Sequence, residues 1–214
     1  MSKEQSSVVV LHSGGLDSTV CLLLAIEQGF VPVSVGIDYG QRHSVELQFA
    51  QRQCARFGVE RRLLAVRWDK PDRPLPLDRG LEQMRASVSP AFLPGRNILF
   101  LSLAIAEAAG IGATQVWTGV NSVDFSGYPD CRPEFIEAFR AMIRSGMTHS
   151  PELVAPLQFL PKREIARLAH RLGVGKGDTW SCYRPVDADG SVIPCGRCDA
   201  CILHEEAWKG VDEP

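Results

Sequence analysis

Several features that would assign this chain to a specialised class of protein are missing from its 214 residues. No apolar run approaches the roughly 20 residues needed to cross a bilayer, and Ile98–Ala109 is among the longest. The polar start, Met1–Ser7, lacks the hydrophobic stretch of a signal peptide. Neither a low-complexity tract nor a long internal repeat is visible by eye. We therefore expect a globular, cytoplasmic protein that has no membrane partner.

An excess of charge of one sign is also missing, because 23 basic residues balance 25 acidic ones to give a net charge of −2. This balance argues against nonspecific binding to nucleic acid or to anionic membranes. The composition is 45% hydrophobic and 22% charged, which is typical of a folded domain. A chain of this length can bury a core of its own. We expect residues 1–178 to form the main domain.

Segments with strand patterns and helix patterns alternate along the chain. Short β-branched or alternating runs predict strands at Ser7–Leu11, Val31–Asp38, Arg61–Val66, Gln115–Thr118 and Leu153–Ala155. Helical periodicity predicts helices at Thr19–Gln28, Ser44–Phe57, Ile98–Ala109, Phe135–Arg144 and Lys162–Leu172. Such alternation predicts an α/β fold, a parallel sheet with helices on both faces, whose ligands bind beyond the carboxyl ends of the strands. Trp68–Pro94 contains five prolines and is expected to be a long surface loop or lid.

The loop after the first predicted strand, residues 12–19, reads His-Ser-Gly-Gly-Leu-Asp-Ser-Thr. Two glycines allow a tight turn that brings backbone N–H groups close to an anion, and the hydroxyls add donors at a helix start, where phosphate is favoured. Asp17 would repel phosphate unless a cation lies beside it, so Mg²⁺ is expected there. No lysine follows the second glycine, which excludes a Walker loop. The alternative is an ordinary capped helix after a Gly-Gly turn.

Seven cysteines are placed unevenly, with four of them close together near the end of the chain. An odd number of cysteines in a protein that is not exported indicates thiols and metal ligands rather than disulfides. The four expected ligands are Cys182, Cys195, Cys198 and Cys201. Four thiolates suffice for a closed, structural Zn²⁺ site, while an iron–sulfur cluster remains an alternative. We expect residues 179–214 to form a zinc knuckle. From Cys182 to Pro214, three basic residues against seven acidic ones give −4, which argues against binding of nucleic acid.

The sequence Ser-Gly-Gly-Leu-Asp-Ser at residues 13–18 resembles the PP-loop of ATP pyrophosphatases, which cut ATP between the α and β phosphates. Three further motifs narrow the resemblance: Asp-Tyr-Gly-Gln-Arg-His-Ser at 38–44, Pro-Gly-Arg-Asn at 94–97, and Asp-Phe-Ser-Gly-Tyr-Pro-Asp-Cys-Arg at 124–132. Together with the Cys-Gly-x-Cys-Asp-x-Cys ending, they are similar to the QueC family of 7-cyano-7-deazaguanine synthases. His204 stands where we expect arginine in that family.

This resemblance implies a Rossmann-like sheet of the adenine nucleotide alpha hydrolase type. It also implies an enzyme of queuosine biosynthesis that converts 7-carboxy-7-deazaguanine and ammonia to 7-cyano-7-deazaguanine. The conversion would use two molecules of ATP and pass through an adenylate and an amide. We expect a homodimer. Alternatives are a relative that transfers a deazaguanine to a protein amine, a PP-loop enzyme that sulfurates tRNA, and a nucleotide-binding module without catalytic activity.

The resemblance further implies roles for individual residues. The expected ATP-binding residues are His12, Ser13, Gly14, Gly15, Leu16, Asp17, Ser18, Thr19, Ile37 and Asp38. The expected catalytic residues are Asp17, Ser18, Arg96 and Lys162. Arg96 and Lys162 would neutralise phosphate charge; without the resemblance they would be a helix-start arginine and an exposed lysine.

The expected substrate-binding residues are Asn121, Asp124, Phe125, Ser126, Tyr128, Asp130 and Arg132. Asp124 or Asp130 would accept from the donor edge of the guanine-like ring, and Arg132 would face the substrate carboxylate. Phe125 or Tyr128 would stack on the ring. Cys131 is expected to line the site rather than act as a nucleophile, because no second cysteine lies beside it.

Overall fold

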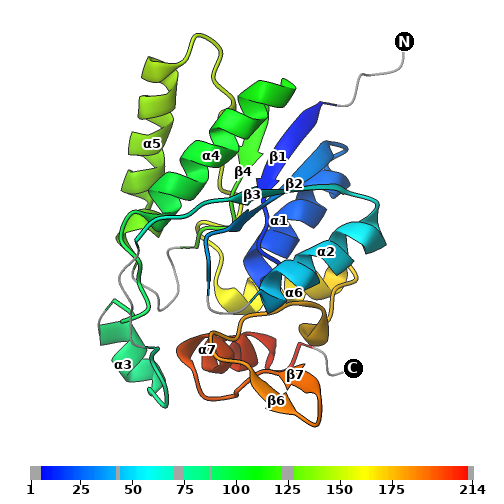
Figure 1. Ribbon diagram of the computed structural model, residues 1–214, viewed down its shortest axis with the longest axis vertical. Helices are drawn as coiled ribbons and strands as arrows, with labels where there is room; N and C mark the ends of the chain where they lie inside the picture. The colour runs from blue at the N-terminus through cyan, green and yellow to red at the C-terminus, as the bar shows by residue number, and fades with distance from the viewer. Residues whose placement is uncertain (1–5, 42–43, 70–74, 87, 122–127, 212–214) are drawn as a thin grey trace.

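A five-stranded parallel sheet forms the centre of the computed structural model, which describes residues 6–41, 44–69, 75–86, 88–121 and 128–211 (Figure 1). The strands lie in the order β3-β2-β1-β4-β5. Their bounds are β1 Ser7–Leu11, β2 Val31–Asp38, β3 Glu60–Ala65, β4 Gln115–Trp117 and β5 Glu152–Val154. The order reverses between β1 and β4, so the carboxyl ends of these two strands form the crevice in which such sheets bind ligands.

The central strand β1 buries side chains on both of its faces, as expected for a parallel sheet covered by helices. Val8 and Val10 belong to the core beneath α1 (Leu16–Glu27) and α6 (Lys162–Arg171). Val9 belongs to the opposite core, beneath α4 (Arg96–Ile111) and α5 (Pro133–Gly146). Helix α2 (Val45–Phe57) contributes Cys54 to the first core and ends at Gly58, whose φ is 67°. The predicted α/β sheet with helices on both faces is confirmed.

Helix α1 begins three residues before the predicted start at Thr19. Gly15 has an extended conformation and its carbonyl accepts the Thr19 N–H at 3.0 Å. Asp17 and Ser18 therefore lie in the first turn of the helix instead of in a loop before it. This shift brings the helix N-terminus, with its unpaired amides, directly to the end of β1.

The proline-rich segment 75–94 contains a short helix, α3 (Leu81–Ala86), where the sequence predicted only a loop or lid. Met84 and Leu93 are buried. The segment also runs antiparallel to the cysteine region, since Leu77 forms a β-bridge with Cys198. Most described residues of the segment are partly or fully exposed, as expected of a surface loop, but it also contains a short helix and buried apolar side chains that the sequence did not predict.

Three elements near the end of the chain were not predicted. They are the hairpin strands β6 (Val186–Ala188) and β7 (Ser191–Ile193) and the helix α7 (Asp199–Trp208). Asp189 and Gly190, with φ of 53° and 79°, form the hairpin turn. Two 3-10 turns, Pro129–Cys131 and Lys176–Asp178, complete the fold. Figure 1 shows β6, β7, α7 and α3 gathered at one end of the molecule. Across the described part of the chain, no helix is long and apolar enough to cross a membrane.

Candidate active site and metal centre

A cleft of about 410 Å³ opens beyond the carboxyl ends of β1, β2 and β4. The start of α4 and residues 180–207 of the carboxy-terminal region form its other walls. The predicted site residues that line it are His12, Ser13, Gly15, Leu16, Asp17, Ser18, Ile37, Arg96, Asn121, Tyr128 and Lys162. The cleft therefore brings together residues that are far apart in sequence, at the edge of the sheet where ligands were expected.

The loop that joins β1 to α1 turns its carbonyl groups away from the cleft. The Gly14 carbonyl accepts the Trp180 N–H at 3.0 Å and the Gln53 side-chain amide at 3.3 Å. The Gly15 carbonyl accepts the Thr19 hydroxyl at 2.8 Å and the Ser18 hydroxyl at 3.1 Å. Because N–H and C=O point in opposite directions across a trans peptide, the N–H groups of Gly15 and Leu16 are left on the cleft side, where the Gly15 N–H makes a long hydrogen bond to Ser13 Oγ at 3.4 Å. Outward amides at a helix N-terminus make this loop an anion-binding site.

Two glycines allow the loop to pack tightly against its neighbours. Gly14 has φ of 90°, and a Cβ there would lie 2.4 Å from the Glu46 carbonyl oxygen of α2. A Cβ on Gly119, after β4, would lie 2.9 Å from the backbone of Asp17 and Ser18. The loop is thus held between α2 and the end of β4, and a side chain at either glycine would displace it.

The side chains of His12 and Asp38, two predicted ATP-binding residues, bond to neighbouring residues of the protein. The His12 ring is 1% exposed and bonds to Ser34 and Gln53. Burial, with a smaller contribution from Arg61, lowers the pKa of His12 to about 3, so the ring is neutral. The Asp38 carboxylate pairs with Arg67 at 3.1 Å, and its carbonyl accepts the Val66 N–H.

Asp17 and Lys162 form an ion pair across the cleft, although 145 residues separate them. Lys162 is the first residue of α6, which brings its ammonium group to the phosphate loop. Asp17 Oδ1 is buried and has no hydrogen-bond partner among the described residues. A carboxylate beside a phosphate site, with one oxygen unsatisfied, fits Mg²⁺, which is usually held by one or two carboxylates and the phosphates of the substrate.

Arg96 begins α4 and interacts with all three tyrosines of the chain, Tyr39, Tyr128 and Tyr183. A cation at a helix N-terminus opposes the helix dipole, so this position does not stabilise the helix itself. Burial disfavours the charge, but the tyrosines outweigh it, and the pKa of Arg96 is raised. Its positive charge is therefore available to a ligand in the cleft.

The predicted substrate residues divide into those that line the cleft, those that do not, and those outside the described residues. Tyr128 and Asn121 line the cleft, and the Tyr128 ring lies 5.2 Å from that of Phe92. Asn121 donates to the carbonyls of Leu157 and Leu160 and so fixes the turn before Lys162. Asp130 and Arg132 are not among the described residues that line the cleft. Asp124, Phe125 and Ser126 lie outside the described residues.

Asp130 and Arg132 have local contacts outside the described lining of the cleft, although Asp130 still interacts with the charge of Arg96, which is part of that lining. The Asp130 carboxylate accepts the Cys131 thiol at 3.9 Å and is buried beside its own helical turn. Arg132 is exposed and caps α5. The expectation that these two side chains contact substrate therefore has no support from their positions in this structure.

Cys131 lines the cleft as a neutral thiol. Burial and the neighbouring Asp130 raise its pKa to about 12. Its sulfur accepts the Asn97 side-chain amide at 3.5 Å. A thiol with so high a pKa is a weak nucleophile at neutral pH, which agrees with the lining role expected for it.

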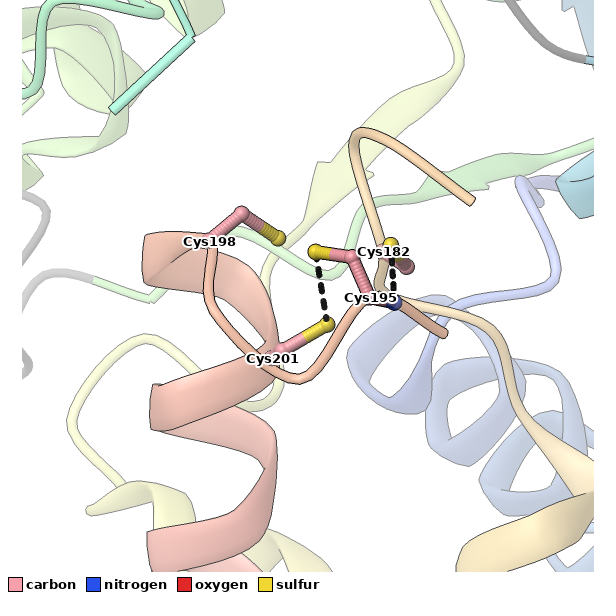
Figure 2. Close-up of side chains that lie close together, drawn as sticks. All are labelled: Cys182, Cys195, Cys198 and Cys201. Atoms are coloured by element: carbon pink, nitrogen blue, oxygen red, sulfur yellow. Dashed lines mark hydrogen bonds between the residues drawn. The ribbon is translucent and has the colours of Figure 1, made fainter. Parts of the chain in front are cut away.

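The four clustered cysteines form a second site beside the cleft. Cys182 lies before β6 and Cys195 lies after β7, while Cys198 and Cys201 lie at the start of α7 (Figure 2). All four sulfur atoms lie within 4.8 Å of one another. Tetrahedral Zn²⁺ with bonds of about 2.3 Å separates its thiolates by about 3.8 Å, so the group can hold a single metal ion after small adjustments.

Hydrogen bonds favour the thiolate at Cys198 and only partly offset burial at Cys182. Hydrogen bonding from the Cys201 thiol lowers the pKa of Cys198 to about 5. The N–H groups of Arg184 and Cys195 each donate to Cys182 Sγ at 3.3 Å, but burial still raises the pKa of Cys182 to about 11. Hydrogen bonds of this kind stabilise metal-bound thiolates.

The inner wall of the cleft next to the metal centre contains Arg79 and Asp199, which sequence reasoning missed, and His204, which it noted only as a departure from the family pattern. Asp199 pairs with Arg79 at 2.7 Å and accepts the Ser89 hydroxyl at 3.4 Å. His204 donates from Nε2 to the Lys176 carbonyl at 3.2 Å. Nothing in the proline-rich segment marked Arg79. Gln53, by contrast, left a trace in the sequence, because it is a polar residue on the apolar stripe of α2, three residues after Ala50.

Comparison with known proteins gives one family. Residues 7–212 match the family model described as queuosine biosynthesis protein QueC. The chain is 54% identical over 205 residues to 7-cyano-7-deazaguanine synthase 2 of Rhodopseudomonas palustris, covering 96% of this chain and 98% of that protein. It is 43% identical over 221 residues to 7-cyano-7-deazaguanine synthase of Myxococcus xanthus, and the match covers 96% of this chain and 95% of that protein.

A solved structure with a similar fold is the U34-tRNA thiolase NcsA of Methanococcus maripaludis, described with a 4Fe–4S cluster. The TM-score is 0.54 at 14% identity, covering 98% of this chain and 69% of that one. At this level of identity the likeness concerns the fold alone.

Proposed function

The chain belongs to the QueC family of queuosine biosynthesis proteins, and from that membership we propose that it makes 7-cyano-7-deazaguanine from 7-carboxy-7-deazaguanine, ammonia and ATP. The resemblance recognised in the sequence motifs is confirmed, because the family match spans residues 7–212. The chain is an ATP-dependent synthase, and the two relatives described above are named 7-cyano-7-deazaguanine synthases.

The observation that carries the proposal is the shared cleft of the phosphate loop, Lys162 and Arg96. Outward amides alone would serve any nucleotide-binding protein. Two cations in the same cleft add compensation for the charge that develops on the phosphates when an adenylyl group is transferred. Such fixed charges act without reorganisation, so positioning and electrostatics account for most of the catalysis.

The chemistry explains why ATP is needed twice. A carboxylate is a poor electrophile at neutral pH, because attack by ammonia would add charge to oxygens that are already negative. Adenylation of one oxygen releases pyrophosphate and creates a leaving group, and ammonia then displaces AMP to give the amide. Adenylation of the amide oxygen releases a second pyrophosphate, and loss of AMP and of both N–H protons of the amide then forms the nitrile. The described residues contain one phosphate loop, which would serve both adenylations in turn.

We assign phosphate binding to the amides of Gly15 and Leu16 and to the hydroxyls of Ser13 and Ser18. Asp17 would hold Mg²⁺ with the phosphates, which would release Lys162 to contact phosphate oxygens. Ile37, at the end of β2, lies where the adenine would bind. Gly14 and Thr19 would hold the conformation of the loop through the hydrogen bonds of the Gly14 carbonyl and the Thr19 hydroxyl.

Glu46 is the described carboxylate best suited to read the ring of the substrate. The 2-amino and N1 positions of a guanine-like ring form a donor edge that a carboxylate matches. Of the carboxylates that line the described cleft, Asp17 forms an ion pair with Lys162 and Asp199 forms one with Arg79. Glu46 accepts the Gln41 amide at 3.3 Å, and the charge of Arg96 opposes the rise in its pKa that burial causes. Asp124 remains the other candidate.

We expect Glu46→Gln to raise the KM for 7-carboxy-7-deazaguanine at least tenfold, because the new amide group opposes a donor edge. The KM for ATP should change by less than twofold. Steady-state kinetics with each substrate varied in turn measure both values. Equal changes in the two KM values would contradict the assignment.

We propose that Cys182, Cys195, Cys198 and Cys201 hold one structural Zn²⁺. Closely spaced thiolates around one point suit a single ion, whereas the ligands of a 4Fe–4S cluster are spread over four iron atoms. The four protein ligands would leave no position for substrate, so this ion would supply stability and not chemistry. Metal analysis by mass spectrometry would give one zinc per chain, and a brown, iron-containing protein would contradict the proposal.

The decisive experiment supplies the protein with ATP, Mg²⁺, ammonium and 7-carboxy-7-deazaguanine and follows the products by mass spectrometry. We expect the nitrile, with two AMP formed for each nitrile. Synthetic 7-amido-7-deazaguanine should reach the same product with one ATP and without ammonia. Release of ADP in place of AMP would overturn the assignment, and an adduct on a protein amine would identify the final acceptor as protein.

Transfer of sulfur to tRNA receives no support, because Cys131 is a buried thiol of high pKa and the carboxy-terminal region is acidic. We further propose that the enzyme is cytoplasmic and forms a homodimer, which light scattering coupled to size-exclusion chromatography would test. Residues 1–178 and 179–214 remain our proposed division into a catalytic domain and a metal-binding segment.

A further inference from the structure

Gln53 lies beneath the phosphate loop with every hydrogen-bonding position of its side chain occupied. It is 5% exposed, on the face of α2 that packs against the loop. Its oxygen accepts His12 Nε2 at 2.8 Å and lies 3.2 Å from the Thr19 hydroxyl. Its nitrogen donates to the Gly14 carbonyl at 3.3 Å and to the Asp178 carbonyl at 2.7 Å. Since carbonyl groups cannot donate, the amide has one possible orientation.

The bonds of Gln53 continue in a directed chain across the sheet. Arg61 on β3 donates to Ser34 Oγ at 2.9 Å, and Ser34 Oγ lies 2.9 Å from His12 Nδ1. His12 must donate from Nε2 to the Gln53 oxygen, so its Nδ1 accepts the Ser34 proton. The neutral form of His12, with a pKa of about 3, suits both contacts. The polar groups of Ser34, His12 and Gln53 therefore each have a partner, although Arg61 Nη2 has none among the described residues. Gln53 is the last member of the chain before the loop.

We propose that Gln53 is a positioning residue for ATP, which sets the orientation of the Gly14–Gly15 peptide. The Gly14 carbonyl has two donors, Gln53 from α2 and the Trp180 N–H from the carboxy-terminal region. A carbonyl held inward by both keeps the Gly15 N–H directed outward. Gln53 also bonds Asp178, two residues before Trp180, so it fixes the second donor as well as the first.

Removal of this side chain affects the amide that faces phosphate more than the fold. Without Gln53 the Gly14 carbonyl retains one donor, and rotation of the peptide toward the cleft would direct an oxygen at the phosphates. That change weakens binding of ATP in the ground state and in the transition state alike, so it raises the KM for ATP while kcat changes little. The inference rests on the proposed binding of ATP by the loop.

The test compares three variants of the full-length protein by steady-state kinetics and by binding of α,β-methylene-ATP with Mg²⁺. For Gln53→Leu we expect the KM for ATP and the Kd of the analogue to rise about tenfold. The KM for 7-carboxy-7-deazaguanine should stay within twofold. Gln51→Leu is the matched control, since it makes the same change two residues away on the exposed face of α2. It should leave both constants unchanged.

Ser34→Ala separates positioning from loss of stability. It removes a buried hydrogen bond from the same chain and should lower the melting temperature, but it leaves both donors of the Gly14 carbonyl in place. Its KM for ATP should stay within twofold of the wild-type value. If Ser34→Ala raises this KM as much as Gln53→Leu does, the effect follows stability and the proposal is wrong.

Gln53→Glu provides a second variant if the leucine variant does not fold. It retains acceptors for His12 and Thr19 but turns a carboxylate oxygen toward the carbonyls of Gly14 and Asp178, so the KM for ATP should rise at least as much. An unchanged Kd in both Gln53 variants would overturn the inference while the wild type still binds the analogue. Failure of the wild type to bind the analogue would instead overturn the proposed function of the loop.

Discussion

The phosphate loop and the cysteine region are both suited to binding ions, yet different interactions keep them in shape. The loop is held by the chain itself, because the Gly14 and Gly15 carbonyls are each satisfied by at least two donors. In the cysteine region the ligand residues contact one another through weak hydrogen bonds to sulfur, such as that between Cys195 and Cys201 at 4.0 Å. Four thiols that close would separate unless a metal ion held them.

This difference predicts opposite responses to loss of the ion. The loop should keep its geometry without nucleotide or Mg²⁺, while the cysteine region should depend on its metal for structure. Mutations in the loop should then affect catalysis with little effect on folding, and mutations of the cysteines should do the reverse. The four changes below test this contrast.

The largest effect is expected from Cys198→Ala. A structural Zn²⁺ contributes roughly 10–16 kcal/mol in small zinc peptides, and Cys198 is fully buried between α7 and the segment 75–94. The variant should lose its metal and the order of residues 182–208. Metal analysis and hydrogen exchange measure the two losses. A metal-free variant with native exchange protection would show that the cysteine region, like the phosphate loop, keeps its structure without an ion, and would contradict the prediction.

Asp17→Asn should reduce turnover by a factor of about 10² to 10³, the usual effect of removing one fixed electrostatic contact at a transition state. Its melting temperature should change little, because Asp17 already has one oxygen without a partner among the described residues. AMP release and thermal unfolding give the two quantities. A large drop in melting temperature with normal turnover would show that the loop, too, depends on its ion site for folding.

Arg79→Met should destabilise the contact between segment 75–94 and α7 by about 3 kcal/mol, because it leaves the buried Asp199 without its cation. The Arg79 and Asp199 side chains are 16% and 5% exposed. Arg197→Met breaks a neighbouring pair whose side chains are 68% and 54% exposed, and should cost at most about 1 kcal/mol. Limited proteolysis of residues 75–94 distinguishes them, and equal cleavage of the two variants would contradict the prediction.

His12→Gln tests the support beneath the loop through pH. The folded protein lowers the pKa of His12 from 6.5 to about 3, so the unfolded chain binds the extra proton between these values. Stability from neutral His12 is complete above pH 6.5 and falls by about 1.4 kcal/mol per pH unit below it. Urea unfolding at pH 7 and pH 5 should show about 2 kcal/mol more loss in the wild type than in the variant. Parallel profiles would mean that the ring is not held neutral.

The sequence predicted the sheet and the phosphate loop well because both are local. Ser7–Leu11 and Val31–Asp38 were predicted with the observed bounds, since β-branched runs between turns are a direct indication of buried parallel strands. The residues of the loop are contiguous, so one short motif was enough to identify them. The four cysteines were identified as metal ligands because cysteine is a ligand by residue type and the four lie close together in the sequence.

The remaining parts depend on contacts that no local pattern encodes. Helix α3 is short and lies between prolines, and its stability comes from docking Met84 in the core. Asp130 and Arg132 have side-chain chemistry that suits a substrate, but the 3-10 turn at Pro129–Cys131 directs them elsewhere. Gln53 and Arg79 depend in part on partners more than 100 residues away, Asp178 and Asp199.

The bonds from Asp178 to Gln53 and from Trp180 to Gly14 have a consequence for the order of events during synthesis. The phosphate loop leaves the ribosome well before two groups that complete it, because the Trp180 N–H that donates to the Gly14 carbonyl follows about 165 residues later and Lys162 follows Asp17 by 145 residues. Domains tend to fold from the amino terminus as they emerge, so a nascent chain that ends near residue 150 can form β1 and β2 without a finished nucleotide site. Such a chain should not cleave ATP, and consumption of ATP would begin only once residues 162–180 have emerged.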